Sequence, residues 1–144
     1  MSRIVTITEA AKDALNGGSY SAPYASVEAV RAYKVTYTLE ELATLRVSVV
    51  PAARNITTAD RTRNQYEYEI HVAVMKRLDP SGVEADQLDQ LELLVEELLA
   101  GLDRQPQAGA RFLRSSHAPI YDQTMLEEDN TFMSLFRLFY LEVA

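Results

Sequence analysis

Residues 131–143 read Thr-Phe-Met-Ser-Leu-Phe-Arg-Leu-Phe-Tyr-Leu-Glu-Val, and this alternating apolar stretch decides the fold class. Successive residues of a strand point to opposite faces of a sheet. One side therefore carries Phe132, Phe136, Leu138 and Tyr140, and the other carries Met133, Leu135, Phe139 and Leu141. A strand that is apolar on both faces lies in a sheet covered on both sides, or another subunit completes one face. Phe132, Phe136 and Tyr140 are therefore candidate contacts with another subunit.

The longest helix is predicted upstream of this strand, between Glu84 and Asp103. Its apolar residues recur at steps of three and four, which places them on one helical face: Leu88, Leu91, Val95, Leu98 and Leu102. Ser81 and Glu84 have the spacing of a capping box at its start. Seven acidic residues and no Lys or Arg lie in this segment, so it accounts for the whole net charge of −7. The predicted acidic face comprises Asp89, Glu92, Glu96 and Glu97.

A hairpin is predicted before the helix. Residues 47–50 form a short apolar strand that Pro51 closes, and residues 66–74 alternate as a second, antiparallel strand. Residues 52–64 between them lack a periodic apolar pattern and carry Arg54, Arg61 and Arg63, which predicts a long basic loop. Arginine is well suited to paired hydrogen bonds with carboxylates. The loop arginines could contact phosphates, or carboxylates of a neighbouring subunit, for which the 84–103 helix is the expected source. A solvated, flexible loop is the alternative.

The remaining segments complete an α+β pattern. Thr6 and Glu9 have capping-box spacing and predict a short N-terminal helix that stops near Gly17. Alternation over residues 27–37 predicts a half-buried strand, and residues 111–116 predict another. We therefore expect one domain spanning residues 1–144. Its mainly antiparallel sheet would carry one long helix and one short N-terminal helix, as in a ferredoxin-like fold.

Composition narrows the classes of function. A chain of 144 residues with 47% hydrophobic content fits one domain with its own core. No cysteine is present, which excludes disulfides, thiolate metal sites and cysteine nucleophiles. The acidic balance argues against general nucleic-acid binding, which depends on clustered basic residues. No secretory signal or long uncharged apolar run is present, so we expect a protein made in the cytoplasm without membrane insertion.

Chemical motifs are lacking in the sequence. The two histidines, His71 and His117, have no metal-ligand partner at helical or hairpin spacing. Acids along one helix, without loop carbonyls or histidines, are poor ligands for calcium or for a pair of metal ions. The sequence contains no phosphate-binding loop and no nucleophile elbow. We expect neither a cofactor nor a metal, and we expect the protein not to be an enzyme.

Several phrases, taken in order, resemble a known family. They are Leu39-Glu-Glu-Leu, Leu45-Arg-Val-Ser-Val-Val-Pro51, Ala73-Val-Met-Lys-Arg-Leu78, Leu91-Glu-Leu-Leu-Val-Glu-Glu-Leu98, Pro119-Ile-Tyr-Asp122 and the aromatic strand from Phe132. From about Val27 to the C-terminus, the chain resembles the tail terminator or tail completion proteins of long-tailed bacteriophages and prophages. The joint order of the phrases carries the resemblance, because none of them is a chemical motif.

The resemblance implies a tail-terminator-like fold, in which helices flank one side of a sheet. It further implies a homo-oligomeric ring, typically a hexamer, that caps the tail tube, ends its polymerisation and presents a surface to the head connector. The expected partners are other copies of the chain, the tail tube protein and a head connector or neck protein. DNA would pass through the ring without specific binding. The expected location is the head-facing end of the tail in the virion, after assembly in the host cytoplasm.

Two further questions stay open at this point. The acidic helix could line the lumen of the ring and repel DNA, or it could face outward into solvent. The chain could instead be a small ferredoxin-like regulatory or ligand-binding module, in which Tyr33, Tyr37, Tyr66 and Tyr68 line a pocket. The mass in solution separates these classes, because a ring predicts a hexamer or a monomer that assembles on a tube.

Overall fold

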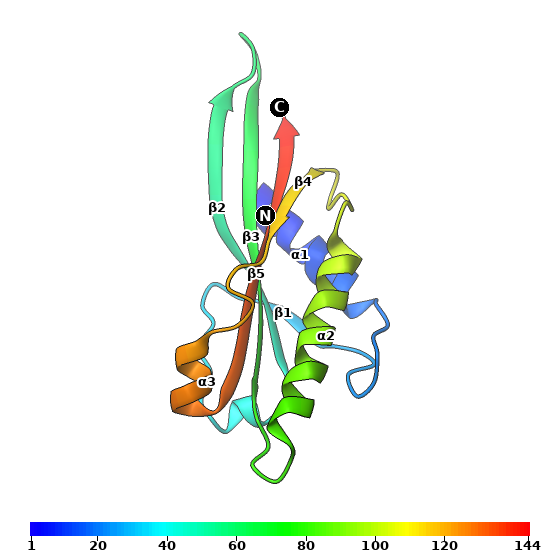
Figure 1. The fold of residues 1–144 in the computed structure, drawn as a ribbon. Coiled ribbons are helices and arrows are strands. Elements are labelled where there is room, and N and C mark those ends of the chain that lie inside the picture. The colour runs from blue at the N-terminus through cyan, green and yellow to red at the C-terminus, as the bar shows by residue number, and fades with distance from the viewer.

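The computed structural model describes all of residues 1–144, and its centre is a five-stranded sheet in the order β1-β2-β3-β5-β4 (Figure 1). The elements in chain order are α1 (Arg3–Asn16), β1 (Ala29–Arg31), the 3₁₀ turn η1 (Glu41–Ala43), β2 (Arg46–Thr58), β3 (Asn64–Arg77), α2 (Glu84–Leu102), β4 (Arg111–Ser116), α3 (Gln123–Asp129) and β5 (Thr131–Val143). Neighbouring strands are antiparallel except β1, which runs parallel to β2. This arrangement confirms the predicted α+β class and its mainly antiparallel sheet.

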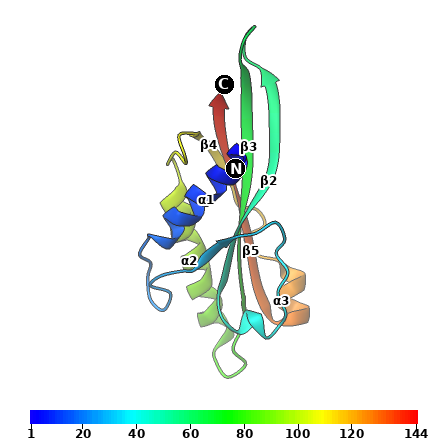
Figure 2. The same ribbon diagram turned by 180° about the vertical axis from the view of Figure 1, so that it is seen from behind.

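Helices α1 and α2 cover one face of the sheet, and α3 lies on the opposite side (Figures 1 and 2). One core cluster of 22 buried residues joins the two covering helices to the strands. The buried side of α2 is a leucine-rich stripe: Leu91, Leu94, Val95, Leu98 and Leu102. This stripe packs on apolar strand residues such as Val72 and its cross-strand partner Phe136. Burying one such side chain contributes about 1.5–3 kcal/mol, so this layer dominates the stability of the fold.

Strand β5 has the predicted position but not the predicted free surface. Phe132, Phe136 and Tyr140 point to the side covered by α1 and α2, where their exposed fractions are 2%, 0% and 0%. The prediction that these three side chains contact another subunit is wrong, because the chain's own helices already cover them. On the opposite side Met133, Leu135, Phe139 and Leu141 are half-buried.

The predicted loop over residues 52–64 is also wrong in extent. Strand β2 continues to Thr58 and β3 begins at Asn64, so the turn takes up only residues 59–63. A bulge between Pro51 and Ala53 absorbs the proline, which cannot donate a ladder hydrogen bond, and the strand continues beyond it. The run of β-branched residues that follows favours a strand and was the missed signal.

The hairpin therefore forms a projecting arm, defined here as residues 52–66 (Figure 1). The end of β5 runs along the β3 side of the arm as far as the turn, since Val143 lies opposite Gln65 and the backbones of Asn64 and Ala144 exchange hydrogen bonds of 2.8 and 2.9 Å. Asp60 holds the tip, where its Oδ1 accepts from the amides of Thr62 and Arg63, both at 2.9 Å. The arm is thus an ordered ribbon whose side chains are almost all exposed.

Three element starts or ends differ from the sequence predictions. Helix α1 begins at Arg3 with Ser2 as its cap, one turn before Thr6. Helix α2 begins without a side-chain cap, because the Ser81 hydroxyl donates to Asp79 instead. Strand β1 spans three residues, because the chain then crosses to the other face of the sheet, where the Tyr37 hydroxyl lies 2.7 Å from Ser48 Oγ.

Tyr140 offers a test of the core. Its side chain is fully buried and its hydroxyl has no hydrogen-bond partner. Because a buried unsatisfied polar group costs about 1–3 kcal/mol, Tyr140→Phe should raise the free energy of unfolding by about 1 kcal/mol or more. Chemical denaturation of the full chain measures the change.

Tyr20→Phe is the matched control for this substitution. The Tyr20 hydroxyl donates to the Leu15 carbonyl oxygen at 2.6 Å, so its removal should lower the free energy of unfolding by roughly 1 kcal/mol. Equal destabilisation by both substitutions would show that the Tyr140 hydroxyl is satisfied.

Candidate functional site

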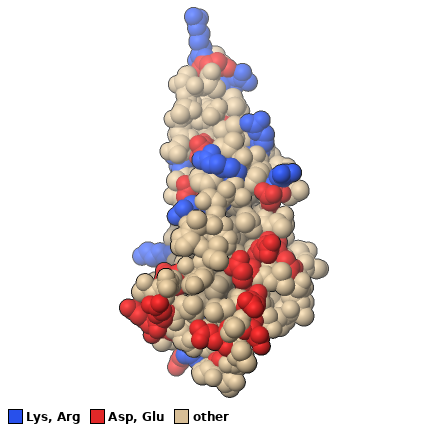
Figure 3. Space-filling view, in the orientation of Figure 1, with Lys and Arg blue, Asp and Glu red and all other residues tan.

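Charge is segregated along the length of the molecule. Figure 3 shows Lys and Arg gathered toward the end that carries the arm, and Asp and Glu gathered around the opposite end. The acidic end contains α2 with its acids and α3 with Asp122, Glu127, Glu128 and Asp129 nearby. Such separation orients an approaching partner, because complementary fields steer association.

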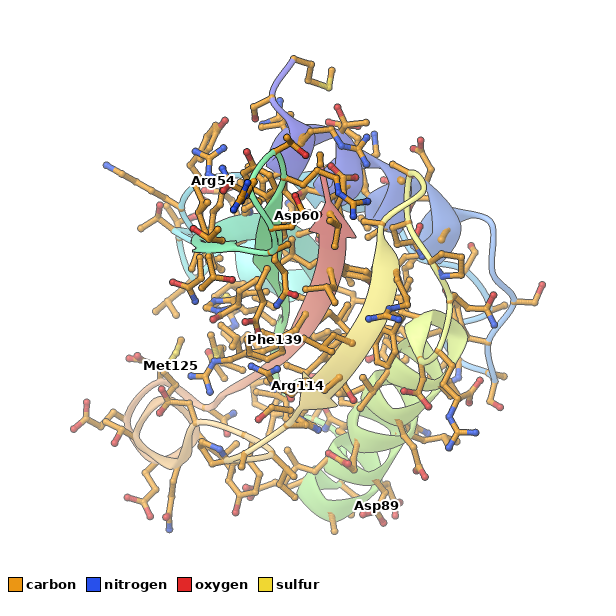
Figure 4. All side chains as sticks on the ribbon, turned by 90° about the horizontal axis from the view of Figure 1, so that it is seen from above. Arg54, Asp60, Asp89, Arg114, Met125 and Phe139 are labelled. Atoms are coloured by element: carbon orange, nitrogen blue, oxygen red, sulfur yellow. The ribbon has the colours of Figure 1, made fainter.

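All three predicted arginines, Arg54, Arg61 and Arg63, are exposed on the arm. Arg63 is already engaged within the turn, since its Nη2 lies 2.7 Å from Asp60 Oδ2. The amide of Thr62 and the guanidinium of Arg63 hold the pKa of Asp60 below its usual value. Arg54, labelled in Figure 4, and Arg61 form no ion pair within the chain, so the guanidinium groups of both are available to a partner.

The structure divides the predicted acidic face into two groups. Asp89 and Glu96 are exposed on the outer side of α2, whereas Glu92 and Glu97 are half-buried at its flanks. Glu97 accepts the Ser21 amide at 3.0 Å, and Glu92 lies near His117. Steps of three and four along the helix define the outer stripe of α2 as Asp86, Asp89, Leu93, Glu96 and Ala100, all exposed. Leu93, at its centre, is 43% exposed and was not among the predicted site residues.

The sheet face opposite α1 and α2 is covered at one end by α3 and residues 32–45, and is uncovered toward the arm. The uncovered part, named the open face here, comprises Glu67, Glu69, His71, Arg111, Arg114, Leu135, Arg137, Phe139 and Leu141. At its centre the guanidinium of Arg114 lies 4.1 Å from the centroid of the Phe139 ring (Figure 4). Arg114 also pairs with Glu67 at 2.7 Å, while Arg137 lies 4.0 Å from Glu69.

A groove of about 660 Å³ continues from the open face toward α3. Met133, Leu135 and Arg137 line it from β5, and residues 118–123 line its other side. The loop is fixed, because the Ser134 hydroxyl donates to the Ile120 carbonyl at 2.7 Å and the Asp122 amide donates to the Met133 carbonyl at 2.8 Å. The groove is thus preformed.

His117 and Ser134 are the closest approach to catalytic geometry, with Nε2 2.8 Å from Oγ. A serine nucleophile gives its proton to the histidine. Here the hydroxyl proton is directed to the Ile120 carbonyl, and Ser134 is 0% exposed. His117 therefore donates to Ser134, and the pair positions the loop rather than activating a nucleophile.

The metal-ligand, membrane-helix and tyrosine-pocket features can each be compared with the structure. No group of three or more His, Asp or Glu side chains lies close enough to hold a metal ion. None of the helices combines the length and the hydropathy that a membrane crossing demands. The four tyrosines of the alternative function do not converge: the rings of Tyr66 and Tyr68 stack on the helix side of the sheet, Tyr37 lies on the other side, and Tyr33 is 68% exposed beside Arg31.

No protein-family model matches the chain, and no curated protein is similar to it. Function is therefore inferred from the resemblance in sequence and from three surfaces: the arm, the open face and the outer stripe of α2. All three are exposed surfaces of the protein, and none of them is an enclosed cavity.

Glu92 gives a pH-dependent prediction. Burial raises its pKa, nearby His117 lowers it and Glu96 raises it, with a net upward change. When the pKa of a carboxyl is higher in the folded than in the unfolded protein, its ionisation destabilises the folded state at neutral pH. This penalty shrinks as the pH falls through the folded-state pKa and is absent below the unfolded-state pKa. Glu92→Gln should therefore raise Tm at pH 7, and the gain should shrink toward pH 4.

The exposed neighbour Glu96 supplies the control for Glu92. Glu96→Gln should change Tm less at neutral pH, because that side chain stays in water. A gain for Glu92→Gln that is constant from pH 7 to pH 4, by thermal melts in matched ionic strength, would contradict the burial argument.

Proposed function

We propose that this chain is a structural subunit of a long-tailed phage or prophage. In this proposal it forms a homo-oligomeric ring at the head-facing end of the tail, where it caps the tube, ends its polymerisation and presents a surface to the head connector. The sequence resemblance gives the class of assembly, and the shape and charge of the subunit fit it. The role is mechanical and requires no catalytic group.

The projecting arm is the observation that carries the proposal. The chain exposes 8138 Å², whereas a compact monomer of 16.2 kDa exposes about 7,500 Å². The excess arises because the arm extends beyond the helices that cover the rest of the sheet (Figures 1 and 2). Ile56 on the arm is 55% exposed, and Val143 at the end of β5, which pairs with Gln65 of the arm, is 46% exposed. An ordered, exposed ribbon with apolar and unpaired basic residues is suited to contact with another protein.

The charge pattern supports passage of DNA without capture. A ring of subunits that each carry a net charge of −7 does not attract the phosphate backbone overall. The two unpaired arm arginines are better suited to carboxylates of a protein partner, which they can bind through two hydrogen bonds. We assign the arm to the contact with the tube or the connector.

Deletion of the gene from its phage or prophage tests the proposed function. Without the terminator, tube growth has no stop, so induced lysates should contain overlong tubes without heads, and infectious particles should fall by several orders of magnitude. Negative-stain electron microscopy measures tube lengths, and plaque counts measure infectivity. Normal tails joined to heads in the deletion strain would reject the proposed function.

The arm is tested by complementing that deletion with Arg54→Glu/Arg61→Glu. The substitution reverses the two unpaired arginines and keeps Arg63, which folds the tip. Loss of charge-assisted contacts should leave overlong or headless tails while the chain stays folded by circular dichroism. Arg104→Glu, an exposed arginine outside the arm, is the control. Full complementation by the arm variant would show that the arm arginines do not contribute to the partner contact.

A further inference from the structure

We propose that the ring closes when the open face of one subunit binds the outer stripe of α2 of the next subunit. The inference rests on the proposed ring and names the two surfaces that build it. The second copy of this chain would supply the missing layer over the sheet. Each sheet would then lie between its own α1 and α2 on one side and a neighbour's α2 on the other.

The open face differs in composition from an ordinary solvent-exposed sheet face. Leu135, Phe139 and Leu141 are half-buried there, although the neighbouring strand residues are charged. A solvated sheet face is usually polar, whereas a sheet face with apolar positions is usually covered by another layer. The charged residues are fixed by the Arg114–Glu67 pair at 2.7 Å and by the Arg114–Phe139 contact at 4.1 Å. The surface is therefore ordered before any partner arrives.

The outer stripe of α2 complements this face in apolar and charged character. On the stripe, exposed Leu93 lies between the acids Asp89 and Glu96. On the open face, Phe139 lies between Arg137 and Leu141, whose cross-strand partner is Arg111. Glu67 on this face is paired with Arg114, and Glu69 lies 4.0 Å from Arg137. The three arginines of the open face outnumber these two glutamates, so an acidic stripe with a central leucine meets a face with a central phenylalanine and an excess of basic residues. An exposed leucine at this position also fits protein contact better than a lumen that only repels DNA.

The dimensions of the two surfaces agree. Asp89 and Glu96 are about 10 Å apart along the axis of an α-helix. Arg111 lies opposite Leu141 on the sheet, so Arg111 and Arg137 are separated by four residues of β5, about 13 Å. Flexible arginine side chains cover the difference.

The placement of the surfaces makes the contact directional. Asp89 on α2 and Arg114 with Phe139 lie on opposite sides of the sheet (Figure 4). A contact between two different surfaces is head-to-tail, and such contacts produce closed rings when the rotation between subunits closes. A two-fold dimer through the open face alone would instead bring like arginines together. The helix-to-sheet contact therefore favours a ring over a dimer.

Complementary charge reversal tests the inference in the purified full chain. The sheet variant is Arg111→Glu/Arg137→Glu, which leaves Arg114 and its ion pair intact, and the helix variant is Asp89→Arg/Glu96→Arg. Each variant alone should associate at least about tenfold more weakly than the wild type, because like charges then face each other. Mixing the two variants should restore the assembly, since the reversed open face of one variant then meets the reversed stripe of the other, and the two native surfaces meet each other. A chain with all four substitutions should assemble by itself.

The readout is mass by analytical ultracentrifugation over a concentration series, alone and with tail tubes. Glu127→Arg/Glu128→Arg on α3 applies the same charge change as the helix variant at an exposed site outside the contact and should assemble normally. Circular dichroism and Tm must show that each variant is folded. If the sheet variant misfolds, the helix variant still tests the inference, because both of its positions are exposed. Adding Arg137→Glu alone to the helix variant should then restore its assembly.

The outcomes separate this inference from the proposed function. A wild-type ring together with unchanged assembly of both single-surface variants would overturn the contact and leave the ring in place. Weakening without restoration on mixing would also overturn it, because the two surfaces would then not face each other. A wild type that stays monomeric both at high concentration and on tail tubes would instead reject the ring itself.

Discussion

The contact between the inner stripe of α2 and the buried side of β5 is the constraint on which the rest of the structure depends. Leu91, Leu94 and Leu98 pack over strand residues that include Phe136 and Leu138, and all of these are 2% exposed or less. Because apolar burial is the largest favourable contribution to folding, this layer fixes both the rotation of α2 and the side of β5 that faces it. The outer stripe of the helix and the open face of the sheet are then set as two opposite surfaces of the molecule.

The interactions that stabilise the arm differ from those that stabilise the core. Its order comes from strand pairing and from the Asp60 turn, since almost none of its side chains is buried. A hairpin with so little apolar cover is at the low end of local stability in a folded protein. Pairing of β5 with β3 as far as Gln65 places a third strand along the arm up to its turn and supports it. An element that is ordered yet lightly covered suits a contact completed by another protein.

The distribution of charge and of apolar residues gives the subunit a direction. Basic residues gather at the arm, acidic residues gather around α2 and α3, and the sheet separates the open face from the outer stripe (Figures 3 and 4). In the proposed contact, two different surfaces would bind in one orientation, and a head-to-tail contact of this kind gives a ring and not a symmetric dimer. The same asymmetry makes the two ends of the molecule chemically distinct, which fits the proposed position between the tail tube and the head connector.

The sequence by itself determined the α+β class, the aromatic strand 131–143, the long acidic helix and the hairpin with its arginines, because these follow from local periodicity and turn chemistry. It could not determine that residues 52–58 continue as a strand past Pro51, because a bulge and pairing with β3 decide that. It also placed Phe132, Phe136 and Tyr140 at a surface, because alternation shows that a strand has two apolar faces without showing which face the helices cover. Only the tertiary structure decided this choice, since the covering residues of α1 and α2 lie far away in the chain and meet β5 through burial that no local pattern encodes.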